Sequence, residues 1–237
     1  MKHTTESFAR RSSGTRSQIL EAAGQVFAEK GFDRATGKEI AERANTNSAA
    51  INYHFGGIER LYVAVLTEAH KSVASIEEIA AIAQSPLDPE EKLRRLIAFG
   101  IAALAEARQS WAIRVLSREF LAPTPVRLAV EDRELLPKRR LVAQVVAEAL
   151  GRPEDDPVVS RCCFSVMAPV TLLFVWEAEN AARAFPGCCG DDACAESLVE
   201  HLTEFALGGI RAVAALAAAQ EQGTAAPGQD EPPCSSV

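Results

Sequence analysis

Residues 36–55 read TGKEIAERANTNSAAINYHF, and this stretch predicts two short helices joined by a tight turn. Thr36 and Glu39 have the spacing of a capping box, in which the threonine hydroxyl accepts the N3 amide while the glutamate reaches back to the threonine amide. Asn45 interrupts the first helix, because asparagine tolerates a left-handed turn best after glycine. Asn47 then stands where the second helix needs an N-cap.

The sequence on either side of this stretch is helical in its apolar spacing. A preceding helix ends at Gly31 and shares one face among Ile19, Ala23, Val26 and Phe27. Gly56-Gly57 ends the short helix at about 48–54, and a long helix follows from about Ile58 toward Ala83. Inside the motif, the side chains expected to face inward are those of Ile40, Ala44, Ile51 and Phe55. This arrangement predicts a helix-turn-helix domain.

The rest of the chain is also expected to be helical, since no segment alternates at period two. Further helices are expected at about 89–107, 109–122, 156–184 and 192–221. Another is expected to end at Leu150-Gly151. The fold class is all-α, with a three-helix N-terminal domain and a larger helical domain for ligand binding and dimerisation. The expected divisions are a flexible basic arm at 1–14, the helix-turn-helix at 15–62, the larger domain at 63–222 and a disordered tail at 223–237.

Charge is unevenly distributed along the 237 residues, whose net charge is −7. Residues 1–60 contain 9 Lys and Arg against 7 Asp and Glu, whereas the remainder contains 16 against 25. A basic head on an acidic body is compatible with a protein that touches phosphate at one end only. The longest apolar stretch, around Val166–Trp176, is judged too short to span a bilayer, so a cytoplasmic protein without a membrane partner is expected.

Residues 36–55 closely resemble the N-terminal domain of TetR/AcrR-type regulators, through the spacing I-A-x-x-A … I-x-Y-H-F. The resemblance extends back to Ile19 and forward to Tyr62. It implies a homodimer of about nine helices per subunit, whose third helix reads a double-stranded DNA operator and whose C-terminal domain binds a small-molecule inducer. Asn45-Thr46-Asn47 stands where the family usually has Gly-Val-Ser. Ile58 replaces a usual phosphate-contacting lysine, for which Arg60 is the expected substitute.

The outward side chains of the third helix suit DNA recognition. Serine and asparagine can bond base edges or phosphates, and an alanine methyl can meet a thymine methyl. Tyr53 and His54 are placed to donate to phosphates, as at the family's matching positions, although each alone has a structural alternative. The capped helix start near Thr36 is a second phosphate site, and Arg10, Arg11 and Arg16 extend the basic surface. The predicted DNA-binding residues are Thr36, Lys38, Asn47, Ser48, Ala49, Asn52, Tyr53, His54 and Arg60.

The segment Leu116–Pro125 resembles a Ser-Arg-Glu … Pro-Thr stretch in one branch of these regulators, similar to the group placed beside multidrug exporters. Arg118 and Glu119 share a helical face with apolar neighbours, as a ligand-orienting pair or as a structural ion pair. Pro169 is expected to kink an apolar helix and open space beside it, although core packing is the alternative. The predicted ligand-binding residues are Trp111, Arg118, Phe164, Met167 and Trp176.

The last two helices carry long apolar stripes, which in the family form a four-helix dimer interface. Gly208-Gly209 would permit close helix approach there. The predicted interface residues are Leu198, Leu202, Phe205, Gly209 and Val213.

The predicted function is a ligand-responsive transcriptional regulator, a repressor released by a small apolar or amphipathic molecule. An alternative is control by metal or oxidation at Cys188, Cys189 and Cys194, because thiolates beside carboxylates can bind metal or act as a redox switch. An enzyme is the remote alternative. The chain has no glycine-rich phosphate loop, nucleophile elbow or metal-binding histidine pair, so no catalytic residue, cofactor or metal is predicted.

Overall fold

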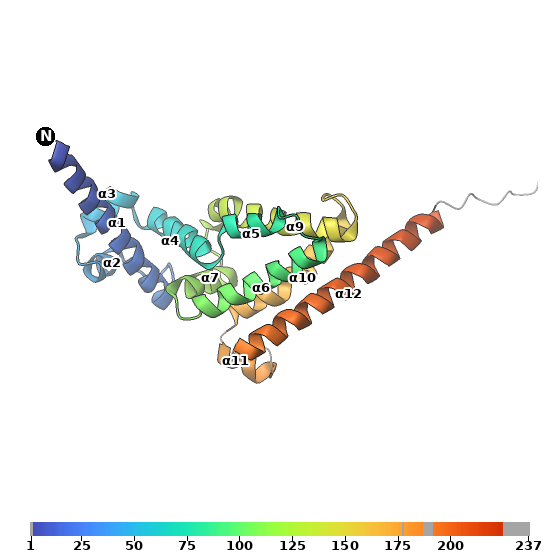
Figure 1. The fold of residues 1–237 in the computed structure, drawn as a ribbon. Coiled ribbons are helices and arrows are strands. Elements are labelled where there is room, and N and C mark those ends of the chain that lie inside the picture. The colour runs from blue at the N-terminus through green and yellow to red at the C-terminus, as the bar shows by residue number, and fades with distance from the viewer. Residues whose placement is uncertain (1, 177, 187–191, 225–237) are drawn as a thin grey trace, which may run out of the picture.

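The computed structural model describes residues 2–176, 178–186 and 192–224, and all regular structure in that part of the chain is helical, as the sequence predicts. The N-terminal end holds four helices around one core (Figure 1). They are α1 (Lys2–Lys30), α2 (Gly37–Arg43), α3 (Ser48–Phe55) and α4 (Ile58–Val73). The two short helices predicted for residues 36–55 are confirmed.

Helix α1 is longer than expected from the sequence. A flexible arm is expected for residues 1–14, but the helix begins at Lys2 and passes through Gly14 without a break. No proline lies between residues 2 and 30, and one glycine costs a helix interior only about 1 kcal/mol relative to alanine. Residues 2–14 are therefore helical in the structure, and α1 projects beyond the other three helices (Figure 1).

The N-terminal core joins side chains from these four helices to others from further along the chain. The four motif residues expected to face inward are all buried: Ile40, Ala44, Ile51 and Phe55. Val65 and Leu66 of α4 belong to the same core, as do Val115 and Val130. The expected division at residues 62–63 therefore falls inside one continuous helix and within one core.

Two helices that the sequence predicts as continuous are each broken into two in the structure. The helix expected from Ile58 toward Ala83 breaks at Ser75, whose hydroxyl accepts a hydrogen bond from the Glu78 amide at 3.1 Å and caps a new helix. The helix expected over 156–184 breaks at Trp176, which has extended backbone. The elements are α5 (Ile76–Ala83), α6 (Pro89–Ala107), α7 (Trp111–Leu121), α8 (Arg127–Val130), the π-helix η1 (Glu131–Leu135), α9 (Leu136–Leu150), α10 (Pro157–Val175), α11 (Ala178–Ala184) and α12 (Asp192–Thr224).

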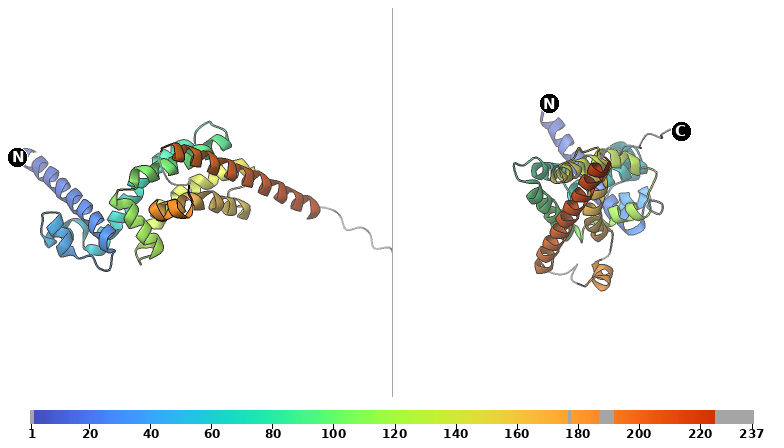
Figure 2. Two further views of the ribbon diagram at one scale, coloured as in Figure 1. Left: turned by 90° about the horizontal axis from the view of Figure 1, so that it is seen from below. Right: turned by 90° about the vertical axis from the view of Figure 1, so that its right-hand side faces the viewer.

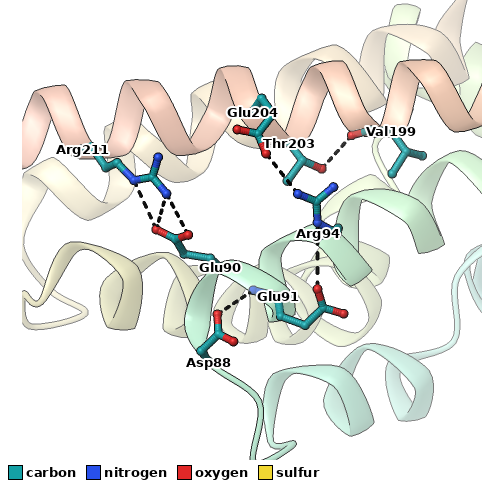
Figure 3. Close-up of polar contacts among 8 residues, drawn as sticks. All are labelled: Asp88, Glu90, Glu91, Arg94, Val199, Thr203, Glu204 and Arg211. Atoms are coloured by element: carbon teal, nitrogen blue, oxygen red, sulfur yellow. Dashed lines mark hydrogen bonds and ion pairs between the residues drawn. The ribbon is translucent and has the colours of Figure 1, made fainter.

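A second core lies among α6, α9, α10 and α12. Helix α12 is also held on α6 by ion pairs (Figure 3). Arg211 binds both carboxylate oxygens of Glu90, at 2.6 and 2.8 Å, and Arg94 donates to Glu204 at 3.0 Å. The four N-terminal helices lie at one end of the molecule, and the far end of α12 extends away from them (Figure 2). These contacts fix the direction of the longest helix relative to the body.

Two helices are long and apolar enough, by length and composition alone, to cross a membrane. They are Pro157–Val175 and Cys194–Gln220, with mean hydropathies of 1.9 and 1.4. The apolar stretch at 166–176 belongs to the longer helix Pro157–Val175, so its own length does not exclude a span there. The core helix of a soluble protein passes the same test, so one or two such helices are weak evidence for a membrane span.

Candidate functional site

Three polar residues set the start of α2 and the turn between α2 and α3, as the sequence predicts. Thr36 has extended backbone, and its hydroxyl accepts a hydrogen bond from the Glu39 amide at 3.2 Å. Asn45 adopts a left-handed conformation with φ of 49°. Asn47 caps α3 by accepting from the Ala50 amide at 3.0 Å. The other half of the capping box is replaced, because the Glu39 carboxylate pairs with Lys30 at 2.7 Å.

The predicted DNA-binding residues lie on the start of α2, on α3 and on the start of α4. Tyr53 is 75% exposed, which excludes a core role for its ring, and the His54 ring meets it edge-on at 4.9 Å between centroids. His54 is half-buried, and the others are exposed: Thr36, Lys38, Asn47, Ser48, Ala49, Asn52 and Arg60. The local fold thus leaves hydroxyl, amide, phenol and cationic groups uncovered on the outer side of α3.

Two arginines frame this surface. The Arg16 guanidinium lies 4.8 Å above the Phe55 ring, so α1 contributes a cation beside the end of α3. Ile58 packs partly buried against the N-terminal core. The Arg60 side chain lies against Gly56, where a Cβ atom would come within 3.0 Å of Nη1. Arg60 therefore places its charge at the turn between α3 and α4.

Arg118 and Glu119 bind other partners rather than each other, so the alternative of a structural ion pair between them is wrong. Arg118 donates to the carbonyl oxygens of Ala28 and Glu29, at 2.9 and 3.2 Å. Glu119 is buried and accepts a hydrogen bond from the Tyr62 hydroxyl at 2.8 Å. Both side chains are committed to contacts within the chain, because α7 packs directly against α1 and α4.

The five predicted ligand-binding residues differ in their neighbours and exposure in the described part of the chain. Trp111 of α7 packs against α1, where its indole nitrogen donates a hydrogen bond to Glu21 at 2.8 Å. Phe164 is 74% exposed on the outer face of α10, whereas Met167 accepts a contact from the Cys163 thiol at 3.6 Å. Trp176 lies beside Phe185 at 5.7 Å between ring centroids. Helical spacing alone does not show which neighbour each face meets, so this set of ligand-binding residues stays a prediction.

Pro169 does not open a space between α10 and α6. A Cβ atom placed on Gly100 of α6 would lie only 2.9 Å from Val170, the residue after the proline. The two helices approach closely there because glycine removes the side chain that would separate them.

The predicted dimer residues of α12 share one stripe of the helix but differ in how far the rest of the chain covers them. Leu198 is buried within the chain, and Leu202 and Val213 pack against the second core. Phe205 is 76% exposed, and a Cβ atom on Gly208 or Gly209 would have nothing within 4 Å. The exposed apolar side chains on the adjacent helices α10 and α12 are Phe164, Leu172, Phe205 and Leu216. The uncovered face therefore contains Phe205 and Gly209 but not the other three predicted residues.

The cysteines differ in their surroundings. Cys162 and Cys163 are buried in the structure, and burial raises the pKa of both thiols, which favours the unreactive protonated form. Cys188 and Cys189 lie outside the described residues, whereas Cys194 is half-exposed in α12. No group of three potential metal-binding side chains occurs among the residues with described placement.

Two family models match separate parts of the chain. Residues 19–65 match the model described as bacterial regulatory proteins, tetR family. Residues 89–210, more than half of the chain, match the C-terminal domain of the HTH-type transcriptional dual regulator CecR. The two matches together cover the N-terminal motif and most of the helices that follow it.

Individual relatives agree with these models. The chain is 36% identical over 91 residues to the HTH-type transcriptional repressor NicS of Pseudomonas putida, covering 38% of this chain and 42% of that protein. It is 28% identical over 148 residues to CecR of Shigella flexneri, covering 59% and 66% respectively. The matches to the first curated relatives thus span only about two fifths of their length.

Solved structures show the same fold over nearly their whole length. The fatty acid degradation regulator FadR from Bacillus halodurans has a TM-score of 0.62 at 21% identity, covering 81% of this chain and 98% of that chain. FadR from Bacillus subtilis in complex with stearoyl-CoA has a TM-score of 0.63 at 18% identity, with the same coverage. At these identities the likeness concerns the fold alone.

Proposed function

The chain belongs to the TetR family of bacterial regulatory proteins, and on this premise we propose that it is a ligand-responsive transcriptional regulator. It binds a near-palindromic DNA operator as a homodimer, represses transcription from that site and acts in the cytoplasm. A small apolar or amphipathic molecule releases it from DNA. Residues 15–62 supply the DNA contacts, and residues 63–222 supply dimerisation and ligand binding.

The observation that carries this proposal is the exposed face of α3. Asn47 caps the helix at its start, and Gly56 ends it in a left-handed conformation with φ of 76°. Between them, Ser48, Asn52 and Tyr53 are exposed while Ile51 anchors the opposite face. A rigid short helix with uncovered donors and acceptors fits the major groove, where base edges present distinct hydrogen-bonding patterns.

A twofold dimer is supported by the uncovered apolar face of α10 and α12. Phe164 and Phe205 are 74% and 76% exposed, and large exposed apolar side chains that gather together mark interaction surfaces. The open space beside Gly208 and Gly209 lets a second helix approach closely. Two copies related by a twofold axis would present two α3 helices about one DNA turn apart, or a multiple of it.

The test is selection of bound sequences from random double-stranded DNA by the full chain, followed by mobility shift on the selected site. We expect an enriched near-palindrome whose affinity falls steeply with salt concentration. Stearoyl-CoA, present in one of the structural neighbours, is a suitable first amphipathic probe for release. Failure to enrich any sequence would contradict the proposal.

Control by metal or oxidation receives no support from the comparisons. A chain with Cys188, Cys189 and Cys194 replaced by serine should bind the selected operator and respond to an amphipathic inducer as the natural chain does. Loss of the inducer response with normal DNA binding would instead assign the sensor to these thiols.

A further inference from the structure

Helix α7 attaches the N-terminal helices to the rest of the chain at a place remote in sequence. Arg118 Nε donates to the Ala28 carbonyl at 2.9 Å, and Nη2 donates to the Glu29 carbonyl at 3.2 Å. Both carbonyls lie in the last turn of α1, where no amide within the helix remains to bind them. A cation at this end also interacts favourably with the helix dipole. Arg118 therefore acts as a side-chain cap for α1.

A second contact lies about two turns earlier on α7 and one to two turns earlier on α1. The Trp111 indole lies directly on the backbone of α1 at Gly24, where a Cβ atom would be only 2.4 Å from indole Cδ2. The indole nitrogen donates to Glu21 at 2.8 Å, and Gln25 donates to the other carboxylate oxygen of Glu21 at 2.9 Å. Gly24 is thus required for this approach, although glycine is unfavourable inside a helix.

The same helix holds α4 and α10. Glu119 accepts from the Tyr62 hydroxyl of α4 at 2.8 Å, and from the amide and hydroxyl of Thr124 at 2.9 Å each. Ser117 donates to the Phe174 carbonyl in the last turn of α10 at 2.8 Å. Consecutive residues of the Ser-Arg-Glu stretch therefore contact three different helices, α10, α1 and α4.

We propose that Trp111, Arg118 and Glu119, here called the α7 joint, are positioning residues for operator recognition. The joint sets the orientation of α1, α2 and α3 on the body, and thereby the separation of the two α3 helices in a dimer. This inference rests on the proposed function, because separation matters only in a DNA-bound dimer. None of the three residues contacts DNA in this assignment.

The joint can set the separation of the two α3 helices because its contacts form a chain from the dimer face to the N-terminal helices. The uncovered apolar face that we assign to the dimer includes α10, and the end of α10 is tied to α7 through Ser117. Helix α7 in turn holds α1 through two contacts and α4 through one. A loosened joint leaves α3 itself folded on its own core but lets it vary in position relative to the partner's copy. Each half-site contact survives, whereas discrimination between half-site spacings declines.

The experiment measures affinity for the selected operator and for versions with one base pair inserted or removed at its centre. We expect the natural chain to prefer its own spacing by about tenfold or more, since one base pair displaces and rotates a half-site. In Arg118→Ala that preference should fall to about threefold or less, while Arg118→Lys, which keeps a donor, should retain most of it. Arg114→Ala is the matched control, because it removes an exposed arginine from the same helix.

A second measurement uses tryptophan fluorescence to test, in the absence of DNA, whether the Trp111 indole packs on α1. The chain has two tryptophans, so Trp176→Phe leaves Trp111 as the fluorescent probe. Adding Gly24→Ala should displace the indole into water and shift its emission to longer wavelength, with helix content unchanged because alanine favours helix over glycine. The same substitution in the natural chain should reduce spacing discrimination.

The outcomes separate the two proposals. Absence of any enriched operator for the natural chain overturns the proposed function and the joint with it. An enriched operator whose spacing preference is unchanged in both Arg118→Ala and Gly24→Ala overturns the joint alone. An unshifted Trp111 emission in the Gly24→Ala chain also overturns it, because the indole would then not lie on α1.

Discussion

The hydroxyl of Tyr62 donates a 2.8 Å hydrogen bond to the carboxylate of Glu119, and this pair is buried. Burial and the neighbouring carboxylate both raise the pKa of the Tyr62 phenol, so the hydroxyl remains a donor over the whole practical pH range. Tyr62→Phe leaves the buried carboxylate with one donor fewer. We expect the free energy of unfolding, measured in urea, to fall by about 1–3 kcal/mol. The control is Tyr53→Phe on the exposed ring, and an equal loss in both variants would contradict the assignment.

The turn at Asn45 predicts a contrast between two substitutions. Its φ of 49° is left-handed, a conformation that costs a residue with an ordinary side chain about 1–2 kcal/mol and costs glycine nothing. Asn45→Ala should therefore lower the unfolding free energy by about 1 kcal/mol, whereas Asn45→Gly should leave it nearly unchanged. Thermal unfolding followed by circular dichroism measures both. Equal stability of the two variants would exclude a left-handed turn in solution.

The exposed face of α3 predicts different effects for neighbouring residues. Asn52→Ala should relax base preference at one position of each half-site, with a cost of about 1–3 kcal/mol on the preferred sequence. Tyr53→Phe should weaken binding to all sequences alike, because a phosphate contact carries no base information. Mobility shift on the selected operator and its single-base variants, across a salt series, distinguishes the two. Natural affinity in both variants would remove α3 as the reading helix.

The uncovered face of α10 and α12 predicts which charges dissociate a dimer. Phe205→Glu with Leu216→Glu places two carboxylates on exposed positions and should yield a folded monomer by light scattering. Leu202→Glu alone places a charge against the second core and should lower the melting temperature of the chain itself. A dimer that persists in the double variant would place the interface elsewhere.

The His70 imidazole predicts a stability change in mild acid. Burial, assisted by the charge of Lys138, lowers its pKa from 6.5 to about 4. Between these values the unfolded chain takes up a proton that the folded chain does not bind. Stability is therefore fully present above pH 6.5 and declines as pH falls toward 4, by up to about 3 kcal/mol. Urea unfolding of the natural chain and of His70→Asn over this range measures the effect. A natural chain as insensitive to pH as the variant would contradict it.

The sequence alone determined the helix-turn-helix and its polar face, because the signals there are local. A left-handed asparagine, two N-caps and an apolar spacing act within a few residues of one another, and the structure places Asn45, Asn47 and Ile51 as they predict. The split at Ser75 was also locally visible, in a Ser-x-x-Glu pattern that the apolar spacing of the long helix obscured.

Tertiary structure decided what the helices of the larger domain touch. Periodicity places Arg118 and Glu119 on a helical face, but it does not reveal that α1 and α4 lie against that face. Periodicity likewise places Leu202 and Phe205 on one stripe of α12. In the structure Leu202 packs against the second core, whereas Phe205 is exposed. Such contacts join residues about 60 to 110 positions apart, as in the pair Arg94 and Glu204. They depend on how whole helices pack, which no short window of sequence contains.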